Sequence, residues 1–219
     1  MKKKEIIPML AIVGLAVATT FCLSACDNDD DSEESSSTTA GTAVDLGLSV
    51  KWASCNIGAT IPADYGNYYA WGETVPKKSY TSDNSVTDGD GSIDDFSGTA
   101  TYDAASANWG DTWRMPTKDE CEELVDECTW TWTTQTNSDG KTIGGYRVKG
   151  TNGNSIFLPA AGRLNDSTLE ETGNSGFYWS SQPVEDRSDY AYVINFDSSD
   201  WPIGWGRRYL GSSIRPVTD

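Results

Sequence analysis

The sequence predicts an α+β fold: a twisted antiparallel sheet with one main helix over residues 117–128, a short second helix and long loops. Many short apolar segments alternate with glycine-rich turns, which is typical of antiparallel strands. Helix start signals and a helical apolar period coincide most clearly at 117–128. Near the end of the chain, side chains with period two fit one buried face of a strand; these are Tyr190, Tyr192, Ile194 and Phe196.

Residues 1–25 have the features of a bacterial lipoprotein signal peptide. A basic start precedes an apolar segment, Ile6 to Phe21, which contains Pro8 and is short for a membrane span. Leu23-Ser24-Ala25-Cys26 then places small residues before a cysteine, as a lipobox does. The alternative is an ordinary secretory signal with a chance cysteine. We expect cleavage before Cys26 and a lipid on Cys26 that anchors the protein to a membrane.

Residues 26–42 form an acidic segment rich in Ser and Thr that has no large apolar side chain. Such a segment buries too little surface to fold, so we expect a disordered tether. Acidic residues directly after Cys26 resemble the surface-export signal of Bacteroidetes-type lipoproteins, whereas in an enterobacterial host Asp27 would indicate retention in the inner membrane. We expect a protein in the outer membrane that faces the outside of the cell.

The composition excludes several classes of function. The formal net charge of −17 argues against nucleic acid as a partner, because phosphate binding needs a basic surface. The chain has no His, which removes the commonest general base and transition-metal ligand. We expect no metal and no cofactor.

Residues 43–219 are expected to form a single domain. Residues 43–58 predict one or two strands, and 68–73 form an apolar segment that ends in a turn. A polar loop covers 77–97, and its Asp-rich middle resembles a calcium loop. With Gly91 at the sixth position, however, the first and twelfth positions lack carboxylates, so we interpret this segment as a solvated acidic loop.

Two helices are predicted before the middle of the domain, a short one at 102–108 and the main one. Thr117 and Glu120 form the capping box of the main helix. Its apolar stripe consists of Cys121, Leu124, Val125 and Cys128. The two cysteines are separated by about 10.5 Å of helical rise, too far for a disulfide within the helix. Cys55 could pair with either of them, and the odd number means that at least one thiol is unpaired or pairs with another molecule.

The second half predicts mainly strands. Alternating Trp and Thr indicate a strand at 129–134, and two further strands are expected at 145–150 and 155–160 with a tight connection between them. A polar loop is expected over 165–174.

The segment after Phe196 carries the candidate recognition residues. Trp201 and Trp205 lie among Asp, Ser, Pro and Gly without a strand period, so each is either a cap over the core or an exposed stacking surface. Arg207, Arg208 and Tyr209 follow closely and favour a recognition face. The alternative for the two arginines is a solvated edge that neutralises nearby Asp.

Six segments in order resemble the Fibrobacter succinogenes major paralogous domain, found in lipoproteins of gut Bacteroidetes-type bacteria. They are Val44 to Ala53, Tyr69 to Thr74, Trp113 to Thr117, Phe157 to Gly162, Tyr178 to Ser181 and Ser213 to Val217. The resemblance implies a C-type-lectin-like fold whose N- and C-terminal strands pair. The plan is also similar to the variable proteins of diversity-generating retroelements and, more distantly, to formylglycine-generating enzymes. In the variable proteins the corresponding binding loops are 182–189 and 197–209.

The chain departs from two of these relatives. Val184 follows Gln182-Pro183 where vertebrate-type lectins have a calcium ligand, which argues against calcium-dependent sugar binding. The reactive cysteine pair of the formylglycine enzymes has no match among the cysteines of the domain.

We therefore expect a non-catalytic surface lipoprotein, a binding module or adhesin that recognises a glycan or a host or partner protein. Its expected contact residues are Asp186, Arg187, Asp200, Trp201, Trp205, Arg207, Arg208 and Tyr209. A carboxylate-based glycan hydrolase is the enzymatic alternative, although no Asp or Glu lies in an apolar sequence setting that would raise its pKa for acid catalysis. A structural role in a surface or pilus assembly is the third alternative.

Overall fold

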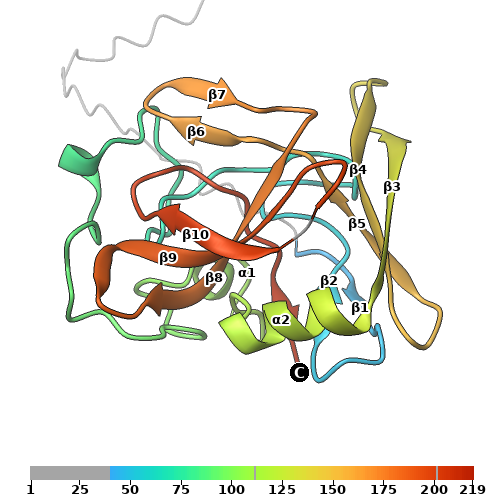
Figure 1. The fold of residues 1–219 in the computed structure, drawn as a ribbon, viewed down its shortest axis with the longest axis horizontal. Helices are drawn as coiled ribbons and strands as arrows, with labels where there is room; N and C mark the ends of the chain where they lie inside the picture. The colour runs from blue at the N-terminus through green and yellow to red at the C-terminus, as the bar shows by residue number, and fades with distance from the viewer. Residues whose placement is uncertain (1–39, 111, 201) are drawn as a thin grey trace, which may run out of the picture. The chain divides into compact units, whose positions relative to one another are not determined.

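The computed structural model describes residues 40–110, 112–200 and 202–219. The signal peptide, Cys26 and nearly all of the predicted tether lie outside these ranges. The described residues form antiparallel sheets and two α-helices, which confirms the α+β class (Figure 1). None of the helices in these ranges is both long enough and apolar enough to span a membrane.

The two ends of the domain meet in one small sheet. Its strands are β1 (Ala43–Val44), β2 (Lys51–Ala53) and β11 (Val217–Thr218), in the order β1-β2-β11. Trp52 on the central strand pairs with Val44 on one side and with Val217 on the other. The expected pairing of N- and C-terminal strands is therefore confirmed (Figure 1).

Both predicted helices are present. The main helix is α2 (Lys118–Glu127), and its capping box is formed by Thr117 and Glu120 as expected. It buries Cys121 and Leu124 against strands of the central sheet described below. The short helix is α1 (Ala104–Trp109), which begins after Asp103. A single 3-10 turn, η1 (Ser82–Asn84), lies in the polar loop.

The Trp-Thr segment begins a three-stranded meander. Its strands are β3 (Thr129–Thr136), β4 (Thr142–Lys149) and β5 (Ser155–Pro159), and each pairs antiparallel with the next. The three predicted strands are confirmed, although β3 and β4 are longer than expected. All three cysteines of the domain are free thiols, and Cys55 and Cys121 are buried.

The central sheet contains β8 (Gly176–Val184), β9 (Arg187–Phe196) and β10 (Ile203–Arg207), in the order β10-β9-β8. Residues on both faces of β9 are buried, not on one as expected, whereas Tyr190 and Tyr192, which were expected on the buried face, are only half-buried. Ile194 and Phe196 join the cluster that includes α2 and the meander, whereas Ala191 and Val193 join a second cluster with Trp179 and α1. The second cluster therefore covers the face of β9 that contains Ala191 and Val193, which we expected to be exposed to solvent.

Three segments expected as loops contain strands, and the last of them, 197–209, contains β10. Residues 165–174 contain part of a hairpin, β6 (Arg163–Asn165) and β7 (Thr168–Glu170). The expected binding loop 182–189 is mostly the end of β8 and the start of β9, joined by a tight turn. Asp186 in this turn has a φ of 57°, a left-handed conformation that Asp tolerates better than most residues.

Candidate functional site

The candidate site is organised by β10, which is an edge strand. Trp205 lies in the middle of β10 and pairs with Tyr192 of β9, so the prediction that it lies in a loop is wrong. Its side chain remains 58% exposed. Trp201 lies outside the described residues, so its predicted contact stays untested.

Glycines stand on either side of Trp205 in β10, and each faces a side chain of another strand of the sheet. A Cβ at Gly206 would lie 2.6 Å from the ring of Trp179, and one at Gly204 would lie 2.7 Å from the Asn195 amide. Only glycine fits against the buried Trp179 ring at position 206, whereas at position 204 the Asn195 amide would have to shift. Because side chains alternate along a strand, Ile203, Trp205 and Arg207 then share the opposite face.

Beside Trp205, two guanidinium groups pack over one aromatic ring. The Cζ atoms of Arg187 and Arg207 lie 4.3 and 5.0 Å from the ring centroid of Tyr190, within the range of cation–π contacts. Both arginines also lie 3.4 Å from the carboxylate of Asp189. We call Trp205, Tyr190, Arg187, Arg207 and Asp189 the β10 surface.

The β10 surface continues in two directions. On one side a depression of about 290 Å³ lies against the β6–β7 hairpin and includes Tyr209, Arg163 and Glu170. On the other, Lys118 of α2 lies 5.3 Å from the ring of Tyr192, the cross-strand partner of Trp205. This part of the molecule therefore has cation–ring contacts at two neighbouring tyrosines of β9, Tyr190 and Tyr192.

Arg208 has a different environment from its neighbour Arg207. It is only 1% exposed and stacks on Trp71 at 4.3 Å. Its Nε donates to Tyr190 O, and its Nη1 donates to the carbonyls of Thr87 and Asp90 at 3.1 and 2.7 Å. Burial lowers the pKa of its guanidinium, and nearby aspartates partly offset that effect. Arg208 is an expected surface contact, but its guanidinium is buried and connects the polar loop, through the carbonyls of Thr87 and Asp90, to β9, through the carbonyl of Tyr190.

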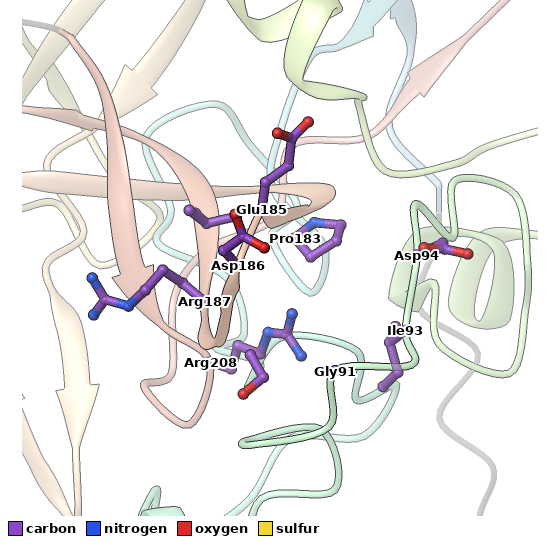
Figure 2. A pocket seen from close by; sticks show the side chains of 10 residues that line it. Gly91, Ile93, Asp94, Pro183, Glu185, Asp186, Arg187 and Arg208 are labelled. Atoms are coloured by element: carbon purple, nitrogen blue, oxygen red, sulfur yellow. The ribbon is translucent and has the colours of Figure 1, made fainter.

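Arg208 nevertheless lines a hollow of about 520 Å³ between the tip of the β8–β9 hairpin and the segment 91–94 (Figure 2). We call it the hairpin hollow. Three acidic residues line it, Asp94, Glu185 and Asp186, and Arg187 joins it to the β10 surface. The expected contact residues Asp186, Arg187 and Arg208 therefore meet here.

Asp200 is separate from both regions. It lines a smaller depression of about 230 Å³ with Asp197 and Phe177. The predicted contact residues thus lie at the β10 surface, at the hairpin hollow and at this smaller depression. Arg187 belongs to the first two and connects them.

Asp103 is the exception to the expectation that no carboxyl lies in an apolar setting. Burial raises its pKa, although hydrogen bonds from backbone N–H groups act in the opposite direction. Those donors belong to Gly98, Ala105, Ser106 and Met115, all within 3.1 Å. The carboxyl caps α1 and holds the following loop, so its oxygens are already engaged.

The Asp-rich loop contains internal hydrogen bonds at its carboxylates. Asp90 accepts from the backbone and hydroxyl of Ser92, and Asp88 accepts from Ser82. Among the described residues, no three His, Cys, Asp or Glu side chains converge as metal ligands.

Comparisons with protein-family models, with characterised proteins and with solved structures gave no match.

Proposed function

We propose that this protein is a non-catalytic binding module or adhesin that recognises a glycan or a partner protein through the β10 surface. The observation that carries the proposal is Trp205, a tryptophan that is 58% exposed in the middle of a regular strand. Within the described ranges it is the only aromatic among the large hydrophobic side chains that are exposed.

The residues beside Trp205 supply polar and charged groups that a recognition surface needs in addition to an exposed ring. An indole stacks on the apolar face of a sugar ring or fills a pocket on a protein, and Trp, Tyr and Arg dominate binding hot spots. Arg187 and Arg207 keep side-chain exposures of 45% and 48%, so their guanidinium groups can donate to a ligand. Stacking on Tyr190 restricts both arginines, which lowers the entropy cost of binding.

The proposal includes the fold type and the location of the protein. The paired terminal strands support a C-type-lectin-like fold and membership in the family that the sequence resembles. The protein is anchored by a lipid on Cys26 and displayed on the outer face of the outer membrane. Protease treatment of intact cells tests the display: we expect the domain to be digested, and complete protection would contradict it.

Ligand binding is tested with arrays of glycans and host proteins, probed with and without a chelator. We expect the wild-type protein to bind in both conditions and Trp205→Ala to lose the signal. Val86→Ala is the matched control, since Val86 is also a highly exposed hydrophobic residue but lies away from the β10 surface. Equal binding by wild type and Trp205→Ala would contradict the proposal.

A further inference from the structure

The guanidinium of Arg208 has one nitrogen that the protein does not use. The single N–H of Nε and the two of Nη1 are matched by three backbone carbonyls, from Tyr190, Thr87 and Asp90. Its Nη2 forms no hydrogen bond within the described part of the chain. A buried guanidinium with two free N–H donors is costly unless a ligand or solvent accepts from them.

Arg208 directs this guanidinium into the hairpin hollow. In Figure 2 the group points between the hairpin and the Gly91–Asp94 segment, whereas the guanidinium of Arg187 points away on the other side of the hairpin. Asp186 lies on the hairpin side of the hollow and Asp94 on the opposite side. Donor and acceptors therefore face a shared space.

The charges around the hollow define the class of ligand. Asp94, Glu185 and Asp186 line it, and Asp88 and Asp90 lie close to Arg208. This excess of carboxylates disfavours an anion, despite the cation at the base. A hydroxyl group can accept from a guanidinium and donate to a carboxylate at once. The side chains of Ile93, Pro183 and Val184 add apolar contact area.

We propose that the hairpin hollow binds an uncharged, hydroxyl-rich ligand such as a sugar ring. Arg208 Nη2 donates to one ligand hydroxyl, and Asp94 and Asp186 accept from others. The volume of about 520 Å³ falls in the range of small-molecule sites, about 300–1,000 Å³. This inference rests on the proposed binding function and adds a second, polar subsite to the β10 surface.

The test is an NMR titration of the ¹⁵N-labelled whole chain with neutral methyl glycosides of glucose, galactose and mannose, and with glucuronate and inorganic phosphate as charged probes. We expect saturable shifts of the Gly91, Asp94 and Asp186 amide signals with at least one neutral glycoside at millimolar concentration. Absence of such shifts for every neutral glycoside overturns the proposal, and so do shifts produced by the charged probes alone.

Two variants in the hollow and one control variant outside it locate the effect. Gly91→Leu fills the hollow; its φ is not positive, and a Cβ there would lie 3.8 Å from Ser188 Cβ, an ordinary contact. We expect it to abolish the shifts, whereas Thr99→Leu, in an exposed position away from the hollow, leaves them unchanged. Asp186→Gly keeps the left-handed turn and removes one acceptor, so we expect affinity to fall about tenfold.

The outcomes separate this inference from the proposed function. Trp205→Ala is expected to retain the glycoside shifts at the hollow while it loses array binding. If array binding depends on Trp205 but the hollow shows no shifts, only the inference about the hollow fails. If Gly91→Leu folds normally and retains all shifts, the glycoside binds elsewhere and the proposal is wrong.

Discussion

The β10 surface and the junction of the two chain ends contain the same residue types, arginine and aromatic rings, in opposite environments. At the junction Arg215 is buried, and its Nε, Nη1 and Nη2 donate to Asn56 Oδ1, Ala53 O and Phe157 O. At the β10 surface Arg187 and Arg207 share one carboxylate at 3.4 Å and remain nearly half exposed. At the junction each guanidinium nitrogen donates to a buried acceptor and holds the scaffold, whereas the exposed guanidinium groups of the β10 surface stay available to a ligand.

This difference predicts that the two regions respond differently to substitution. A buried carbonyl that loses its donor costs the full desolvation of that group, whereas an exposed ion pair contributes little. Junction variants should therefore lower the free energy of unfolding, and β10-surface variants should lower affinity alone.

The largest effect is expected for Arg215→Met. This change removes the donors of three buried acceptors, and we expect the free energy of unfolding to fall by about 4 kcal/mol. Arg207→Met is the matched control, with an expected change within about 0.5 kcal/mol. Urea unfolding followed by circular dichroism measures both. Similar losses for the two variants would remove the distinction between the regions.

A smaller loss is expected for Asp103→Ala, which leaves four backbone N–H groups without their acceptor. We expect about 3 kcal/mol of destabilisation, since the change removes a helix cap and a loop anchor together. Asp189→Ala, the carboxylate of the β10 surface, should cost less than about 1 kcal/mol. The same urea experiment compares them, and a mild effect at Asp103 would show that its hydrogen bonds contribute little.

A pH-dependent effect of about 1 kcal/mol is expected at Glu120, which links α2 to Arg114 beside β11. Burial acts to raise its pKa, but hydrogen bonds from Arg114 and Thr117 lower it below the ordinary 4.5. A carboxyl whose pKa falls on folding stabilises the fold above its unfolded pKa, and this stabilisation is lost as pH falls through the folded pKa.

Glu120→Gln keeps the capping geometry and removes the charge. We expect it to be less stable than wild type near neutral pH, with the difference shrinking as the pH falls below about 4.5. Glu127→Gln, at the exposed end of α2, is the control and should show a smaller difference. A difference that is constant across this pH range would contradict the assigned ion pair.

Local signals predicted most of the scaffold. The capping box at Thr117 and the alternating Trp and Thr of β3 depend on neighbours in sequence, and both are confirmed. The β6–β7 hairpin was missed because each of its three-residue strands has a single apolar residue between polar ones, which is too short to show alternation. The second buried face of β9 was missed because α1 and distant loops supply it, which no local pattern shows.

The candidate site was predicted in part. In β10, Ile203, Trp205 and Arg207 do alternate, but the two intervening glycines concealed the period. Gly206 is required by the ring of Trp179, which lies on another strand. The opposite environments of Arg207 and Arg208 depend on carbonyls from the polar loop, more than a hundred positions away. Sequence composition identified the arginines but not which one reaches solvent.

The central claim is tested most directly by the affinity of Trp205 variants for the strongest array ligand, measured by isothermal titration calorimetry beside their thermal melts. We predict that Trp205→Ala weakens binding by at least about tenfold, that Trp205→Phe retains most of the affinity, and that both melt near wild type. Unchanged affinity in Trp205→Ala, or a large loss of stability, would contradict a recognition role for the β10 surface.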